Sequence, residues 1–344
     1  MIKDRYYYEK LTAKEKQIYN DFYQGALSYA SKIKTIPVSN PKEAMNHVFA
    51  AIMADNPLLY YVDQTKVSYS YSSQYIEIEP TYIFSKSQIA AYNNKINEKA
   101  KQILTEVMRT AGNDDVRREK ALFEYFVKHF TYDSASKYSK DPVRSCKVHS
   151  LLGVFLDGKA VCEGFAEAFK FLMNAMDMEC IVVSGRADWK SSEGHAWNIV
   201  KLNGKYYHTD VTWAISRNED GTIWYDYLNV SDKEISLDHT DFSGVPRCIS
   251  NDLDYYKTVA PEIDNMTTLK NHMKDCIVNR KKEITFRLIK GRGRDAISNP
   301  ANGCALIQEA VKKAHQESDG VGLQYLTKYT DKKNTFLVRF SYDR

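Results

Sequence analysis

A cysteine, a histidine and an aspartate lie in one stretch of the chain, between Gly158 and Trp213, in settings that suit nucleophilic catalysis by a thiol. Cys162 follows a glycine-bearing turn and opens a segment in which apolar side chains recur at helical spacing. We therefore expect Cys162 in the first turn of a helix that buries one face. Unpaired N–H groups and the positive end of the helix dipole favour a thiolate there, and a backbone N–H can point at a developing oxyanion.

His195 and Asp210 lie on opposite sides of the dipeptide Asn203-Gly204. The flanking runs, 195–202 and 205–213, are rich in aromatic and branched residues. An Asn-Gly pair between two such runs predicts a hairpin with a type I′ turn.

The register of this hairpin follows if Leu202 faces Lys205. His195 then lies opposite Thr212, and Asp210 lies opposite Trp197. On one face of the strand pair, His195 and Asp210 become diagonal neighbours roughly 7–8 Å apart, a gap that an imidazole and a carboxylate can bridge. In this arrangement the imidazole takes the thiol proton and later protonates the leaving amine, while Asp210 fixes the tautomer of the ring.

Three blocks of sequence together resemble the core of the transglutaminase-like superfamily, in its bacterial type. They are the segments 158–166, 194–198 and 206–213. The resemblance covers roughly residues 115 to 235 and implies a papain-like α+β core with Cys162 as nucleophile, His195 as base and Asp210 as orienter. It also implies acyl transfer through a thioester on amide bonds of proteins or peptides. Members of the superfamily include cross-linking enzymes, peptidases, deglycosylating amidases and inert relatives, so the acyl acceptor stays open. The calcium-binding segments of the animal cross-linking enzymes have no counterpart here, and we expect neither a metal nor a cofactor.

Other residues compete for parts of this site. His208 shares the face of Asp210 in the derived register and is a rival base, although its place between Tyr207 and Thr209 suits a sheet histidine equally well. His149 precedes the helix of Cys162 and would need a tertiary fold to approach it. A second oxyanion donor is required, and candidates are Asn198, Tyr132 or a backbone group. Trp197 and Trp213 flank the site and either pack in the sheet or wall the acyl-binding slot.

With 344 residues, the chain is long enough for two or three compact units. The pattern predicts three regions: an accessory α+β region at 1–112, the catalytic core at 113–262 and a small α+β module at 263–344. Capping and periodicity predict helices after Thr12 and after Asn40-Pro41, a hairpin at 69–78, a helix through 89–107 and another over 115–129. The last module is expected to contain helices near 269–278 and 306–315, a strand at 284–289 and a hairpin of 323–330 with 335–342.

Charge separates the last module from the rest of the chain. Residues 265–344 contain 16 Lys plus Arg and 8 Asp plus Glu, whereas the whole chain has a net charge of +4. The module is thus basic, at +8, and the remainder mildly acidic. The loop Lys290-Gly291-Arg292-Gly293-Arg294 could bind phosphate or an acidic polymer, but it lacks an aromatic stacking platform and more closely fits a solvated loop.

Cysteine usage and the N-terminus bear on the compartment. The six cysteines show neither tight pairs nor metal-ligand spacing. If Cys162 is a free nucleophile, at least one further cysteine is unpaired in a monomer, which favours a reducing compartment. The first residues lack the apolar core of a signal peptide, and no run of 18 apolar residues occurs, so we expect a cytoplasmic protein without a membrane span, or an exported one if a leader was removed.

Two classes of function are compatible with these features. The leading hypothesis is a thiol hydrolase that forms a thioester on Cys162 at a peptide or glutamine amide and passes the acyl group to water. The alternative acceptor is an amine, as in protein cross-linking. The second class is a non-catalytic scaffold that binds partners through the same fold, with the 25 tyrosines as an extended amphipathic surface.

Overall fold

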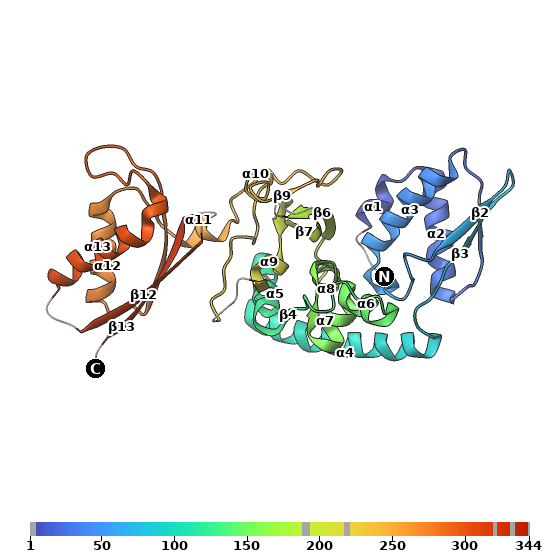
Figure 1. Cartoon of the computed structure of the whole chain (residues 1–344), viewed down its shortest axis with the longest axis horizontal. Helices are drawn as coiled ribbons and strands as arrows, with labels where there is room; N and C mark the ends of the chain where they lie inside the picture. Colours follow the sequence, from blue (N-terminus) through green and yellow to red (C-terminus); the bar gives the residue numbers. More distant parts are fainter. Residues whose placement is uncertain (1–4, 188–192, 217–220, 319–321, 331–333, 343–344) are drawn as a thin grey trace. The chain divides into compact units, whose positions relative to one another are not determined.

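The computed structural model describes residues 5–187, 193–216, 221–318, 322–330 and 334–342 (Figure 1). The chain divides into two compact units, Met1–Ser250 and Asn251–Arg344. Both mix helices and sheets, and the α+β class is confirmed. The finer division into three regions, with boundaries at residues 112 and 262, stays a prediction. No helix in the described parts of the chain is long and apolar enough to cross a membrane.

The first eighty residues form a helical layer with a small antiparallel sheet. Helix α2 begins at the predicted capping box, in which Thr12 and Glu15 bond to each other's backbone N–H groups. The helices are α1 (Tyr6–Lys10), α2 (Ala13–Ser28), α3 (Pro41–Asp55) and the 3-10 helix η1 (Pro57–Leu59). The strands are β1 (Ile33–Thr35), β2 (Ser68–Tyr71) and β3 (Ile76–Glu79), in the order β1-β3-β2. The predicted helices and hairpin of this region are confirmed.

Helices surround the segment that carries Cys162. The long helix α4 (Lys86–Ala111) contacts α5 (Asp115–His129), and both were predicted. The short helices α6 (Pro142–His149) and α7 (Leu151–Asp157) were not. They precede α8 (Cys162–Ala175), and two short strands, β4 (Thr131–Tyr132) and β5 (Lys159–Ala160), pair in parallel beside them.

A four-stranded sheet supports α8. Its strands are β6 (Cys180–Ala187), β7 (Gly194–Leu202), β8 (Lys205–Thr209) and β9 (His239–Thr240), in the order β8-β7-β6-β9. Helix α8 packs on β6 and β7, as Figure 1 shows in green and yellow. The predicted turn is confirmed, because Asn203 and Gly204 both have positive φ and Leu202 pairs with Lys205.

The second strand of this hairpin is shorter than we predicted. Pairing follows the derived register only from Leu202↔Lys205 to Asn198↔Thr209. The segment Val211–Ser216 is helix α9, so the predicted pairing of His195 with Thr212 is wrong. Asp210 accounts for the difference, because its Oδ1 accepts hydrogen bonds from the N–H groups of Thr212 and Trp213 at 2.8 and 3.1 Å. These bonds start a helix where β-prone residue types predict a strand.

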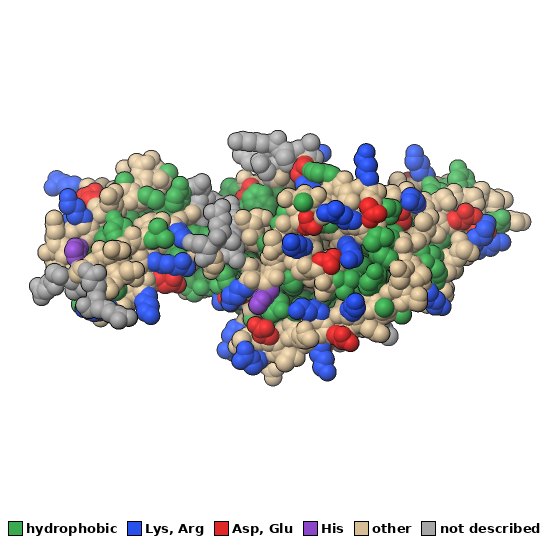
Figure 2. All heavy atoms as spheres, turned by 60° about the horizontal axis from the view of Figure 1, so that its bottom comes forward, with side chains coloured by type: hydrophobic (Ala, Val, Ile, Leu, Met, Phe, Trp, Pro, Cys, Tyr) green, Lys and Arg blue, Asp and Glu red, His purple; other side chains and the backbone are tan. Residues whose placement is uncertain are grey.

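The second unit is a four-stranded sheet with helices against it. The strands, in the order β10-β11-β13-β12, are β10 (Glu262–Ile263), β11 (Glu283–Leu288), β12 (Leu323–Thr330) and β13 (Thr335–Tyr342). The helices are α11 (Tyr255–Val259), α12 (Met266–Val278), α13 (Gly303–Gln316) and the 3-10 helix η2 (Pro300–Asn302). The predicted helices, strand and hairpin of this module are confirmed. Arg292 and Arg294 are exposed, and Figure 2 shows basic side chains at several places on the surface of this unit, at the left. Binding of an acidic polymer stays a prediction.

One buried carboxyl group connects helix α5 to the end of strand β8. Glu119 is completely buried and accepts hydrogen bonds from Oγ1 of Thr209 at 2.8 Å and Nδ2 of Asn229 at 2.7 Å. Burial raises the pKa of Glu119, the two hydrogen bonds oppose the rise, and the resulting pKa is about 7. Thr209 directly precedes Asp210, so this contact helps to position the candidate site.

Glu119 should make stability fall as the pH rises. Because the pKa of this carboxyl is higher in the folded chain than the ordinary 4.5, the folded state favours the protonated form. That advantage is complete below pH 4.5 and is lost as the pH rises to about 7, with a total change of about 3 kcal/mol in the free energy of unfolding. Urea titrations of the natural chain and of Glu119→Gln should converge at low pH and separate by that amount at pH 8. Parallel curves from pH 4.5 to 8 would contradict the assignment.

Candidate active site

Cys162 is the first residue of helix α8, as predicted, and its side chain is partly buried. The apolar positions of the helix, Phe165, Ala168, Phe169 and Leu172, are all fully buried. The start of the helix packs closely on the preceding turn. A Cβ on Gly164 would lie 2.6 Å from the carbonyl oxygen of Ser150, so only glycine fits there. The glycine after Cys162-Glu163 thus holds the cysteine against the rest of the core.

The structure brings the three candidate residues together. The Nε2–H of His195, on β7, donates to Oδ2 of Asp210 at 2.7 Å. This bond leaves Nδ1 of the ring for Cys162, with which the His195 side chain is also hydrogen-bonded. Asp210 lies one residue beyond strand β8 and is completely buried. The three residues therefore come from a helix, a strand and a strand end.

The electrostatics of the three groups reinforce one another. Burial alone raises the pKa of the Cys162 thiol, but the hydrogen bond and positive charge of His195 outweigh it and bring the pKa below its ordinary value. Burial disfavours the charged form of His195, yet the Asp210 carboxylate and Cys162 raise its pKa to about 10. Asp210 in turn is held well below its usual pKa, because the effect of burial is outweighed by the charge and hydrogen bond of His195 and by the hydrogen bond of His239. The arrangement favours a thiolate beside an imidazolium.

A second histidine on the same carboxylate was not foreseen from the sequence. The Nε2 atom of the fully buried His239 lies 3.0 Å from Oδ2 of Asp210, and its Nδ1 lies 2.6 Å from Oδ1 of Asp238. Strand β9 approaches β6 so closely that a Cβ on Gly185 would lie 2.5 Å from the Thr240 carbonyl oxygen. The two-residue strand shows no periodic pattern, and Gly185 was the only sequence signal of this close approach.

His208, the rival candidate for the base, forms hydrogen bonds with residues other than Cys162 and Asp210. Nε1–H of Trp197 donates to Nδ1 of His208 at 3.0 Å, and Nε2 of His208 lies 3.1 Å from Oδ1 of Asp232. An imidazole that accepts at Nδ1 carries its proton at Nε2, so His208 is held as a neutral, hydrogen-bonded sheet residue. His208, Asp232 and Cys248 lie close enough to hold a metal ion, as do His195, Asp210 and His239. In both groups the histidine nitrogens already have the hydrogen-bond partners given above.

Of the remaining candidates, His149 and Tyr132 lie near the thiol, whereas Asn198 is engaged in other hydrogen bonds. His149 lies beside the start of α8, with Nδ1 3.5 Å from Oε2 of Glu163, and the hydrogen bond with Glu163, with a smaller contribution from the charge of Cys162, raises the pKa of His149. Tyr132 is half-buried, and burial followed by the charge of Cys162 raises its pKa, which places it near the thiol. Asn198 is completely buried, and its Nδ2 donates to the carbonyl oxygens of Ala166 and Ile181 at 3.0 and 3.3 Å. These bonds remove Asn198 from the candidates for the oxyanion donor.

The two tryptophans pack around His195. The ring of Trp197 stacks on His195 with centroids 5.8 Å apart, and the centroid of the Trp213 ring lies 6.2 Å from that of His195. Trp197 is fully buried, which confirms its packing role, whereas Trp213 is half-buried. The aromatic rings thus hold the imidazole in one orientation.

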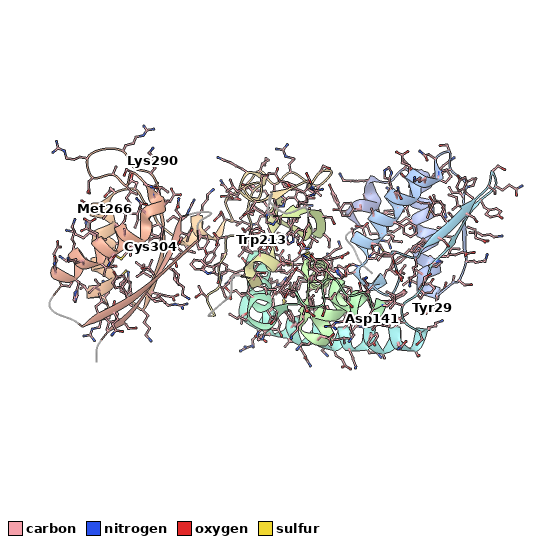
Figure 3. The ribbon with its side chains drawn as sticks, viewed as in Figure 1. Tyr29, Asp141, Trp213, Met266, Lys290 and Cys304 are labelled. Atoms are coloured by element: carbon pink, nitrogen blue, oxygen red, sulfur yellow. The ribbon has the colours of Figure 1, made fainter. Side chains whose placement is uncertain are left out.

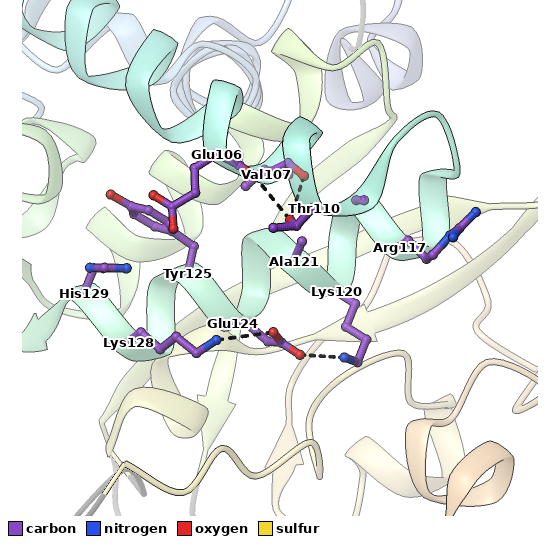
Figure 4. Close-up of a pocket in the computed structure, with 11 residues that line it drawn as sticks. Glu106, Val107, Thr110, Arg117, Lys120, Ala121, Glu124, Tyr125, Lys128 and His129 are labelled. Carbon is purple, nitrogen blue, oxygen red and sulfur yellow. Dashed lines mark hydrogen bonds and ion pairs between the residues drawn. The ribbon is translucent and has the colours of Figure 1, made fainter.

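Another pocket, of about 250 Å³, lies between helices α4 and α5 (Figure 4). Its central carboxylate, Glu124, is already paired with Lys120 and Lys128 at 2.5 and 3.5 Å. None of the three candidate catalytic residues comes from these two helices.

Comparisons with known proteins show which family part of the chain resembles. Residues 101–211 match the model of the transglutaminase-like superfamily, and this range contains Cys162, His195 and Asp210. Residues 101–211 thus form a transglutaminase-like domain. The chain is 21% identical over 155 residues to the kyphoscoliosis peptidase of Mus musculus and 23% identical over 140 residues to that of Homo sapiens.

Those matches are partial. They cover 42% and 38% of this chain but only 23% and 20% of the two peptidases, so the chain spans about a fifth of their length. A solved structure described as a TGase is similar with a TM-score of 0.32 and 17% identity, over 59% of this chain and 55% of that one.

The charge of His195 should depend on Asp210. In Asp210→Asn the carboxylate that raises the pKa of His195 is gone, while burial still disfavours the imidazolium. We expect the pKa of His195 to fall from about 10 to below 7, measured by NMR titration of its imidazole C–H resonances. A pKa that stayed near 10 would assign the shift to another group.

Proposed function

We propose that this protein is a thiol hydrolase of amide bonds, in peptides or at glutamine side chains, with Cys162 as nucleophile, His195 as general base and acid, and Asp210 as orienter. The observation that carries the proposal is the hydrogen-bonded series from Cys162 through His195 to the buried Asp210. The match of residues 101–211 to the transglutaminase-like superfamily supports the same chemistry.

The first half of the reaction forms a thioester. The Cys162 thiolate attacks the carbonyl carbon of the amide, and the carbonyl oxygen takes up the negative charge. The C–N bond then breaks as the His195 imidazolium passes its Nδ1 proton to the departing nitrogen. The products of this half are a free amine and an acyl group on Sγ of Cys162.

The second half releases the acyl group. Neutral His195 takes a proton from water, the oxygen attacks the thioester carbon, and the thiolate leaves as a carboxylic acid forms. Asp210 stays ionised throughout and holds Nε2–H of the ring. His239, which shares the Asp210 carboxylate, acts as a positioning residue.

Oxyanion stabilisation falls to groups at the start of α8. The N–H of Cys162 is at the helix N-terminus, where backbone donors and the helix dipole favour negative charge. Tyr132 is a half-buried side-chain donor near the thiol, since burial and then the charge of Cys162 raise the pKa of its hydroxyl. We assign the second oxyanion contact to its hydroxyl.

Water is the proposed acceptor because hydrolysis needs only access of water to the thioester. Cross-linking needs, in addition, a site that excludes water and presents a lysine amine. One alternative function is cross-linking, in which an amine accepts the acyl group. The other is a scaffold without catalytic activity.

A protein substrate distinguishes these functions. Incubation of casein with the natural chain should release new amino groups or ammonia faster than it incorporates a fluorescent cadaverine. Cys162→Ala should lower this release at least about a thousandfold, and Cys304→Ala, which removes the exposed thiol on α13, should leave it unchanged. Faster incorporation of cadaverine than release would favour cross-linking. Equal signals from the natural chain and Cys162→Ala would favour the scaffold.

A further inference from the structure

Two pockets adjoin the start of helix α8. One, of about 440 Å³, lies against helix α6 and the segment 60–66, and the other, of about 260 Å³, lies against helix α3. They share four lining residues, Val62, Gln64, Glu163 and Glu167. The second pocket is called the α3 pocket below.

The α3 pocket has apolar walls and an acidic end. Its large apolar side chains are Phe49, Met53, Val62, Val67 and Val182, and its charged residues are Glu163 and Glu167. Of the residues that the structure describes, no basic one belongs to its lining. This combination suits a long aliphatic chain that ends in a positive charge, because lysine and arginine bury their methylene stems against apolar surface while the charged end finds a carboxylate.

Glu167 is a buried carboxyl group that accepts one hydrogen bond from the residues that the structure describes. It is 6% exposed, and its Oε2 accepts from the N–H of Leu151 at 3.0 Å. Among the described residues, no lysine, arginine or histidine pairs with it. The nearby Lys66 pairs with Asp63 at 3.4 Å, and His149 pairs with Glu163 at 3.5 Å. Burial and the charge of Glu163 raise the pKa of Glu167 well above its usual value. Without a cation nearby, burial holds Glu167 in its neutral form, and a positive charge that enters the pocket would favour the ionised form and pair with it.

The pocket lies beside the candidate catalytic residues. Glu163 follows Cys162 directly and lines it. Ser184 lines it from strand β6 and pairs with Ala196 of β7, and these two side chains lie on the sheet face opposite to that of His195. The pocket therefore adjoins the catalytic residues from the side of Cys162, and a side chain next to the reacting amide can enter it there.

We propose that the α3 pocket is a substrate subsite that takes a lysine or arginine side chain next to the reacting amide, with Glu167 as the residue that determines this specificity. This inference rests on the proposed function of Cys162, because it assigns a substrate class to the same site. The aliphatic stem lies along the wall formed by α3 and β6, and the cationic end pairs with Glu167 and Glu163.

Thiol-reactive probes test the subsite without any need for turnover. Two iodoacetamides differ only in the end of their arm: N-(5-aminopentyl)iodoacetamide is cationic, and N-hexyliodoacetamide is neutral and of matching length. The rate of alkylation at each cysteine is followed by mass spectrometry for both. Cys304 is exposed on α13 (Figure 3) and serves as the reference. The ratio of the two alkylation rates at Cys304 gives the difference in intrinsic reactivity between the two reagents.

At Cys162 the cationic arm should react faster, with a rate ratio at least about tenfold above that at Cys304. Glu167→Gln keeps the acceptor for Leu151 but removes the charge, and should bring the ratio to within about twofold of the Cys304 value. Glu98→Gln, an exposed change on α4, is the matched control and should leave the ratio unchanged.

A second pair of variants shows whether a loss of the preference is caused by misfolding. Ala50 is exposed on α3 and lines the pocket. Ala50→Lys supplies a competing cation and should abolish the preference, whereas Ala50→Glu, at the same position, should retain it.

Three results would overturn the inference: equal ratios at Cys162 and Cys304 in the natural chain, a preference that survives both Glu167→Gln and Ala50→Lys, or no reaction of Cys162 with either probe. The outcome is separable from the proposed function. A preference for the cationic arm in a protein that cleaves no amide would support the subsite and contradict the hydrolase. Cleavage of casein without such a preference would do the reverse.

Discussion

The site depends on the environment of one buried carboxylate. Oδ1 of Asp210 accepts hydrogen bonds from the backbone N–H groups of Thr212 and Trp213, and Oδ2 accepts hydrogen bonds from the side chains of His195 and His239. With two donors on each oxygen, a fully buried negative charge becomes tolerable, since hydrogen bonds to the ionised form offset the loss of water. Removing any one of these donors would leave a buried charge short of partners.

These contacts also determine the local fold. The bonds to Oδ1 end strand β8 and begin helix α9, and the bonds to Oδ2 tie together β7 and β9, which lie on opposite sides of β6. Glu119 supports the same junction from helix α5 through Thr209. The chemistry at His195 and the packing of four segments thus share a single group, so a change that weakens the site should also weaken the sheet around it.

The sequence predicted those parts that local physical rules determine. Asn203-Gly204 specified a turn and register, and the apolar spacing after Cys162 specified a helix, because turn geometry and one-sided burial are short-range effects. Helix α9 was missed because Val211, Thr212 and Trp213 are β-prone, and only the capping by Asp210 makes them helical. His239 was missed because it reaches Asp210 through a strand of two residues from a distant part of the chain. The α3 pocket was out of reach for the same reason, since its walls combine α3, β6 and α8.

The central claim is that His195, held by Asp210, stabilises a thiolate at Cys162. The most direct measurement is the rate of iodoacetamide labelling at Cys162 against pH, by mass spectrometry, for the natural chain and for His195→Ala, with Cys304 as the internal reference. The claim predicts that Cys162 of the natural chain is labelled rapidly at a pH well below that at which Cys304 reacts, that His195→Ala loses this rapid labelling, and that the labelling of Cys304 is the same in both proteins. Labelling of Cys162 with the midpoint of a free thiol, near about pH 8.5, or labelling that is unaffected by the loss of His195, would contradict it.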